Sequence, residues 1–110
     1  MNKSLIVLLA LLATLMAFDA FAQDGMLGMR RQADSQFRIA EKAYRKAIKD
    51  YGDSLDGLPL EEKTSACKKM SSALHDNKTQ YNMEDVFGQM KYKKQIKKLE
   101  TYNSALGCNK

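Results

Sequence analysis

This chain of 110 residues has little of what most enzymes use for catalysis. It holds one histidine, His75, two cysteines, Cys67 and Cys108, and no tryptophan. The motifs of nucleotide-binding loops, zinc proteases, dithiol redox centres and serine-hydrolase elbows are absent. Asp76 directly follows His75, so on a helix the two side chains point apart and cannot act as a catalytic pair. We therefore expect no enzymatic activity.

Proline and strand-like patterns are also scarce. Pro59 is the only proline, and no segment shows the alternation of apolar and polar residues that marks a half-buried strand. Helical periodicity is plain instead. We therefore expect an all-α fold, a small antiparallel three-helix bundle with an interrupted third helix and one disulfide.

The longest apolar run lies at the N-terminus. Residues 5–18 are apolar apart from Thr14, Lys3 precedes them, and Ala20-Phe21-Ala22 has the small residues of a cleavage site. This pattern predicts a secretory signal peptide over residues 1–22 and a single helical domain over residues 23–110. An uncleaved anchor is the alternative, but the run is shorter than the roughly 20 residues of a spanning helix. We expect a periplasmic or secreted protein.

The first helix of the bundle is predicted over residues 26–51. Its apolar residues recur every three or four positions, in a stripe about 100° wide, as expected for a helix that faces a core. Gly52 is a natural stop, and residues 52–59 read as a turn-rich linker. The stripe consists of Met26, Met29, Ala33, Phe37, Ala40, Tyr44, Ala47, Ile48 and Tyr51.

The second helix is predicted to open at Pro59, with Glu61 and Glu62 near the positive end of its dipole. One face carries the core residues, and Cys67 lies at its centre. The face comprises Leu60, Thr64, Cys67, Met70, Leu74 and Tyr81.

The third helix is predicted to begin at Asn82, a good N-cap residue. Its apolar residues fall on two nearly opposite faces, which one straight helix cannot bury against one partner. We expect an interruption near residues 88–91, or a first half that packs against something else. One face carries Met83, Val86, Phe87 and Met90, and the other carries Tyr92, Ile96, Leu99 and Leu106.

Two cysteines in an exported chain most simply form one disulfide, Cys67–Cys108. An intermolecular bridge and two free thiols are the alternatives. In a plain hairpin that turns near Tyr81, Cys67 would lie about 20 Å from the turn and Cys108 nearly 40 Å from it, at about 1.5 Å per residue. The bridge therefore requires a bend in the third helix or a tail that folds back after Leu106. We expect the bend.

The most distinctive polar feature is the lysine-rich segment of residues 91–98, in a chain of net charge +5. We interpret it as a surface for an acidic partner protein, although a membrane surface, an anionic envelope polymer or a merely solvated helix face would fit the same pattern. Because the chain is exported, no nucleic acid partner is expected, and the oligomeric state stays open. The candidate residues are Lys91, Tyr92, Lys93, Lys94, Lys97 and Lys98. The sequence thus favours an exported, non-enzymatic binding protein, such as an inhibitor, immunity protein, chaperone or accessory subunit of the cell envelope.

The alternative is a small helical carrier of haem, copper or a hydrophobic ligand. Methionine and histidine are ligands for copper(I), and His75 would complete such a set. The methionines fall on the apolar stripes, however, where methionine commonly fills a core. We therefore expect no metal site and no cofactor. The methionines in question are Met26, Met29, Met70, Met83 and Met90.

Overall fold

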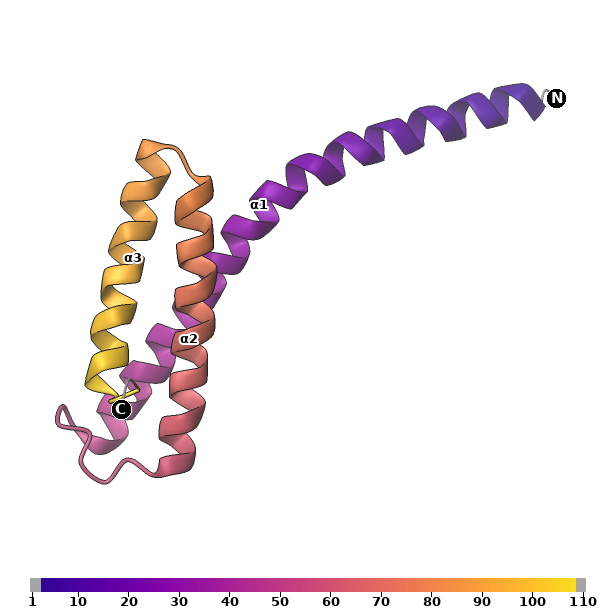
Figure 1. The fold of residues 1–110 in the computed structure, drawn as a ribbon. Coiled ribbons are helices and arrows are strands. Elements are labelled where there is room, and N and C mark those ends of the chain that lie inside the picture. The colour runs from indigo at the N-terminus through magenta and orange to yellow at the C-terminus, as the bar shows by residue number, and fades with distance from the viewer. Residues whose placement is uncertain (1–2, 109–110) are drawn as a thin grey trace. The chain divides into compact units, whose positions relative to one another are not determined.

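The computed structural model describes the backbone of residues 3–108 and the side chains of residues 27–108. These residues form three helices, α1 (Lys3–Tyr51), α2 (Leu60–Met83) and α3 (Val86–Ala105), and no strand (Figure 1). The all-α prediction is confirmed. Side chains of the predicted signal peptide, residues 1–22, lie outside the described set. Among the described residues, no helix has the length and apolar character of a membrane span.

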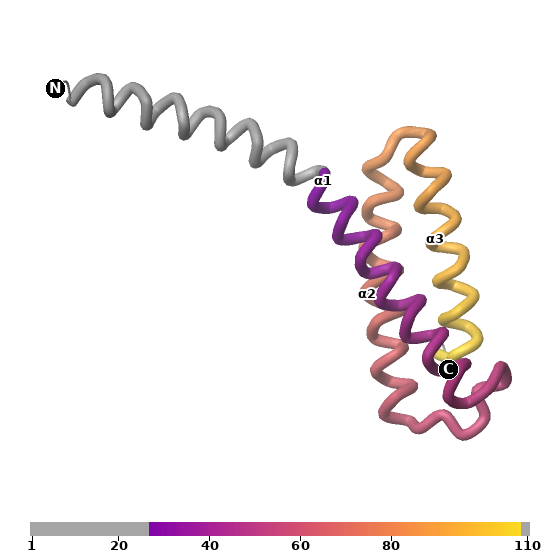
Figure 2. The backbone as a smooth tube through the Cα atoms, turned by 180° about the vertical axis from the view of Figure 1, so that it is seen from behind, coloured from indigo at the N-terminus to yellow at the C-terminus, as the bar shows by residue number. Residues whose placement is uncertain are grey.

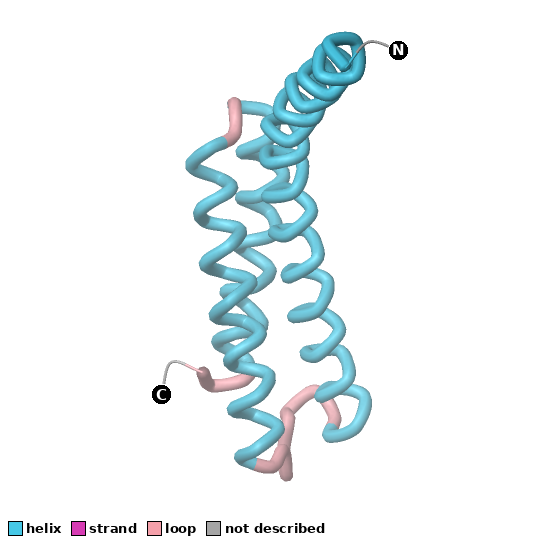
Figure 3. The backbone as a smooth tube through the Cα atoms, turned by 90° about the vertical axis from the view of Figure 1, so that its right-hand side faces the viewer, coloured by secondary structure: helices cyan, strands magenta, loops and turns pink. Residues whose placement is uncertain are grey.

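The chain divides into two compact units, Met1–Arg30 and Arg31–Lys110. The second unit contains the bundle, in which the part of α1 after Arg31 crosses the α2–α3 hairpin (Figure 2). The turn between α2 and α3 lies at one end of the hairpin, and the linker and the C-terminus lie at the other (Figure 3). The disulfide and the α2–α3 turn therefore mark opposite ends of the bundle.

The core is built from residues seven positions apart on each helix, the repeat of helices that pack side by side at a small crossing angle. Small alanines on α1 and α2 let these two helices approach closely. Larger residues come from α3 and fill the remaining space. The repeat consists of Ala33, Ala40 and Ala47 on α1, Ala66 and Ala73 on α2, and Tyr92, Leu99 and Leu106 on α3 and its C-cap, all buried.

The buried face of α2 differs from the predicted one. Its buried residues are Ala66, Met70, Ala73, Asn77 and Gln80. Leu60, which the pattern placed in the core, is 77% exposed, and Cys67 is only half-buried at the edge of the core. The prediction assigned the core face of α2 from its large apolar residues. In the structure, the face that packs in the core instead carries two alanines, Met70, Asn77 and Gln80.

The ends of the linker follow the prediction. α1 stops at Tyr51, and Gly52 adopts a φ of 81°, which suits a residue without a side chain. α2 begins at Leu60, after Pro59 as its N-cap, with Glu61 and Glu62 in the first turn.

The start of α3 and its continuity both differ from the prediction. α2 continues through Asn82 to Met83, and the N-cap of α3 is Asp85, whose carboxylate accepts the N–H of Gly88 at 3.0 Å. From Val86 to Ala105 the helix is unbroken, so the interruption expected at residues 88–91 is wrong. The chain reverses at residues 84–85, between α2 and α3.

The tail after α3 folds back, and this reversal explains the disulfide. Gly107 has a φ of 73°, the N–H of Gly107 bonds to the carbonyl of Ser104 at 3.0 Å, and that of Cys108 bonds to Asn103 at 3.1 Å. This pair of bonds is a Schellman motif. It brings Cys108 to Cys67, with 5.5 Å between the Cα atoms. The predicted pairing is confirmed as an intramolecular bridge, but the tail and not a bend in α3 makes it possible.

Candidate binding surface

The lysine-rich segment lies on the solvent side of α3. The side chains of Lys91, Lys93, Lys94, Lys97 and Lys98 are exposed, and we call these five residues the lysine face. Tyr92 is only 1% exposed, so its side chain belongs to the core and does not reach a partner. Its role is to hold α3 against the bundle from the inside. We therefore leave Tyr92 out of the lysine face.

Lys91 differs from the other four lysines because it is tied to α1. Its ammonium group contacts the Asp34 carboxylate at 2.8 Å and lies 5.2 Å from the ring centroid of Tyr92. Asp34 also accepts the side-chain amide of Gln95 at 3.4 Å. Lys91 thus helps to fix α3 on α1, and part of its charge is neutralised.

The other four lysines of the lysine face are not paired in this way. Among residues 27–108, no ion pair joins Lys93, Lys94, Lys97 or Lys98 to a carboxylate. They project from a continuous helix whose opposite side is anchored by Tyr92 and Leu99. The result is a fixed set of four unpaired positive charges, which can attract an anionic surface.

An open groove of about 560 Å³ runs along the lysine face, between α3 and α1. Phe37 of α1 contributes an aromatic surface, and Gln95 and Thr101 add polar groups. Lys91, Lys94, Lys97 and Lys98 complete the lining. Lysine stems are aliphatic, so the groove combines apolar walls with a cationic rim. The apolar spacing of the sequence predicted Phe37 as a core residue of the first helix. The structure shows that Phe37 also lines this groove, because α3 lies beside that part of α1.

A second surface feature lies at the α2–α3 turn. Four large apolar side chains are exposed there: Met83 (45%), Val86 (72%), Phe87 (83%) and Met90 (59%). We call these four residues the apolar tip. Their shared face was visible in the sequence, and the structure places that face in solvent.

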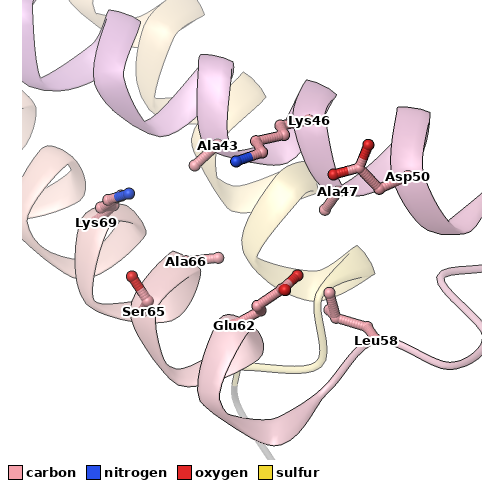
Figure 4. Close-up of a pocket in the computed structure, with 9 residues that line it drawn as sticks. All are labelled: Ala43, Lys46, Ala47, Asp50, Leu58, Glu62, Ser65, Ala66 and Lys69. Carbon is pink, nitrogen blue, oxygen red and sulfur yellow. The ribbon is translucent and has the colours of Figure 1, made fainter.

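A smaller cleft of about 200 Å³ lies between α1 and α2. Lys46 and Asp50 project from α1, and Glu62 and Lys69 project from α2, as Figure 4 shows. Ala43, Ala47, Leu58, Ser65 and Ala66 complete the lining. Next to the cleft, a hydrogen bond to Glu62 and partial burial raise the pKa of Tyr51 above 10.0. The cleft has balanced charges and no histidine, so we assign it no catalytic or anion-binding role.

The other sequence candidates lie apart from this surface. His75 is exposed on α2, and Asp76 accepts a weak hydrogen bond from Gln32 at 3.5 Å. Within residues 27–108, no three His, Cys, Asp or Glu side chains are grouped to hold a metal ion. Of the methionines, Met70 is buried, whereas Met29, Met83 and Met90 are exposed. The expectation of methionines as core filling therefore holds only for Met70; the side chain of Met26 lies outside the described set.

Comparison with known proteins adds no further evidence. The chain matches no protein-family model, and searches of curated proteins and of solved structures found no significant match. The lysine face, the groove and the apolar tip are therefore the features from which we infer a function.

Proposed function

We propose that this chain is an exported, non-enzymatic binding protein whose lysine face binds an acidic surface on a partner protein. The roles in question are those of an inhibitor, an immunity protein, a chaperone or an accessory subunit of the cell envelope. The observation that supports the proposal is the set of four lysines, Lys93, Lys94, Lys97 and Lys98, without carboxylate partners among the described residues. Opposite charges across an interface speed association and select the partner.

The architecture supports a binding role for a second reason. A helix held by a core residue every seven positions presents its outer side chains in a fixed arrangement, so the backbone need not be ordered on binding. The disulfide adds to this rigidity by fixing the tail beside α2. A rigid cationic surface of this kind is suited to a partner with a fixed acidic surface.

The test is affinity capture with the oxidised protein from an envelope and secreted-protein extract of its own source, followed by mass spectrometry. We expect one dominant partner with an acidic surface, lost at high salt because ions screen the attraction. The variant Lys93→Gln, Lys94→Gln, Lys97→Gln, Lys98→Gln should bind that partner at least roughly tenfold more weakly, with unchanged helical circular dichroism.

A matched control removes the same charge from other faces. Lys42, Lys49, Lys68 and Lys78 are exposed and have no ion pair among the described residues. Replacing these four with glutamine should leave partner binding within about twofold of the unmodified protein, because it changes net charge and not the lysine face. Equal loss in both quadruple variants would show a net-charge effect and would overturn the assignment of the site.

A further inference from the structure

The apolar tip is the largest departure from ordinary surface chemistry in the described part of the bundle. Phe87 is 83% exposed and Val86 is 72% exposed, and Met83 and Met90 lie on the adjoining turns. Single exposed apolar residues are common, but a contiguous group of four marks an interaction site. The tip also lies at the end of the hairpin, where the chain turns from α2 to α3 (Figure 1).

The apolar tip and the lysine face are continuous along α3. Helix positions spaced by four and three residues lie in one row on the surface. Two neighbouring rows therefore begin with apolar residues and continue with lysines. One row is Val86, Met90, Lys93 and Lys97, and the other is Phe87, Lys91, Lys94 and Lys98.

We propose that the apolar tip inserts into the interfacial layer of a membrane that contains anionic lipids, with the nearest lysines contacting the headgroups. Interfacial segments bury their apolar side chains by about 5–10 Å. At about 1.5 Å per residue, Lys91 lies about 6 Å from Phe87 along the helix axis, and Lys94 lies about 10 Å from it. If the α2–α3 turn enters the membrane first, with α3 along the membrane normal, these distances place Lys91 and Lys94 at the level of the headgroups.

The same geometry leaves part of the lysine face free. Lys97 and Lys98 lie about 15 Å or more from Phe87 along the axis, above the headgroups. They remain available to a protein partner. Membrane docking is therefore an additional activity, which shares Lys93 and Lys94 with the binding function proposed above and leaves Lys97 and Lys98 to it.

The carboxylates near the tip are held by the protein itself. Asp85 caps α3 through the N–H of Gly88 at 3.0 Å, where the positive end of the helix dipole offsets its charge. Glu84 is only 8% exposed and accepts the side-chain amide of Gln80 at 3.3 Å. Asp34 is paired with Lys91. Lys93 and Lys94, which have no ion pair among the described residues, are therefore the nearest cations that can contact anionic headgroups.

A lipid layer is a better match for the apolar tip than a protein partner is. The apolar end of a hairpin can insert into lipid without a preformed site, whereas a protein partner would need a pocket of matching shape. The order of apolar residues followed by lysines is also the order of acyl chains followed by anionic headgroups.

The experiment is co-sedimentation of the oxidised full chain, as recovered from an oxidising compartment of the expression host, with lipid vesicles. The vesicles contain phosphatidylcholine alone or phosphatidylcholine and phosphatidylglycerol in equal parts. All variants carry the same N-terminus, determined by mass spectrometry, so any leader contributes equally to each. We expect the anionic vesicles to bind the protein and the neutral ones to bind it at least roughly tenfold more weakly.

The variants separate the two parts of the surface. Val86→Ser with Phe87→Ser should weaken binding to anionic vesicles at least roughly tenfold, since burial of these side chains supplies the insertion energy. Lys93→Gln with Lys94→Gln should weaken it by about tenfold and leave binding to neutral vesicles unchanged. Leu60→Ser is the matched control, because Leu60 is 77% exposed but lies at the other end of α2; it should bind as the unmodified protein does.

Three results would overturn membrane docking. These are no binding to anionic vesicles, binding that the serine double variant retains in full, and self-association in solution that the same variant abolishes. The last would assign the tip to a second copy of the chain. Because the vesicles contain no protein, none of these results decides whether the lysine face binds an acidic protein partner, which the capture experiment tests separately.

Discussion

At the scale of single residues, Tyr102 joins α3 to α1 in two ways. Its ring stacks on Tyr44 with 4.4 Å between the centroids, and its hydroxyl donates to the Glu41 carboxylate at 2.8 Å. Glu41 also pairs with Arg45 at 3.2 Å. Burial, followed by the hydrogen bond to Glu41, raises the pKa of Tyr102 from 10.0 to about 12.

This raised pKa predicts an alkaline loss of stability. Because the folded pKa lies above the unfolded value of 10.0, the stabilisation is complete below about pH 10 and is lost as the pH rises through about 12. Tyr102→Phe should lower the free energy of unfolding by about 1–2 kcal/mol at neutral pH and flatten its decline between about pH 10 and 12. Urea unfolding across this range measures both effects. An unchanged alkaline decline would show that Tyr102 is not its source. Glu41→Gln, which keeps an acceptor but removes the charge, should make the decline smaller and end it at a lower pH, because the onset is set by the unfolded pKa.

Asn77 shows how a buried amide serves the contact between α1 and α2. The side chain is fully buried, and its amide donates to the carbonyls of Ala73 at 2.8 Å and Ala33 at 3.1 Å. The bond to Ala33 crosses between the helices at a point where both backbones are close. Asn77-Lys78-Thr79 has the sequence of a glycosylation site, but the burial of Asn77 prevents a glycan from being attached in the folded bundle.

At the scale of the helices, the α2–α3 turn depends on a glycine. A Cβ atom on Gly88 would lie 2.8 Å from Cδ and 2.9 Å from Cβ of Glu84, well inside van der Waals contact. The first turn of α3 can approach the end of α2 only because residue 88 has no side chain. This contact sets the position from which the apolar tip projects.

Gly88→Ala should therefore destabilise the bundle although alanine is the better helix former. We expect a loss of about 1–3 kcal/mol from overpacking, larger than the gain of about 1 kcal/mol in helix propensity. Gly28→Ala is the control, because nothing lies within 4 Å of a Cβ at that position of α1; it should leave stability unchanged or raise it by up to about 1 kcal/mol. Thermal unfolding compares the two. Equal stabilisation by both substitutions would mean that Glu84 moves aside without cost.

At the scale of the whole molecule, the disulfide closes the end of the bundle opposite the apolar tip. It joins positions 41 residues apart and links the folded-back tail to α2. Leu106, just before the Schellman glycine, is buried in the core, so the tail is held by packing as well as by the covalent bond. The disulfide thus stabilises a C-terminal segment that is already packed against the bundle through Leu106.

Cys108→Ser should lower the free energy of unfolding by about 4 kcal/mol, as expected from loop closure over this span. Helical circular dichroism should persist at low temperature, because the seven-residue core repeat does not include either cysteine. The double variant Cys67→Ser, Cys108→Ser should melt at the same temperature as the single variant. A melting temperature equal to that of the oxidised protein would show that packing of Leu106 alone holds the tail.

The sequence by itself determined the features that depend on local chemistry. Apolar spacing established the three helices, and Gly52 and the turn-forming residues of the linker located the break after α1. The presence of two cysteines in a chain with a predicted export signal indicated their pairing. The same local pattern placed five lysines and two separate apolar faces on the third helix. Each of these follows from the geometry of a helix or from the conformational preference of a single residue.

Tertiary packing alone decided which of those faces is buried. Alanines at every seventh position let α1 approach α2 closely, which rotated the core face of α2 toward Asn77 and Gln80 and left Leu60 in solvent. The chain turns at residues 84–85, where Gly88 lies against Glu84, and α3 continues unbroken from Val86 with Phe87 exposed. These outcomes depend on distances between segments far apart in the sequence, and no local pattern encodes such distances. The exposure of the apolar tip beside the lysine face is therefore a property of the folded bundle.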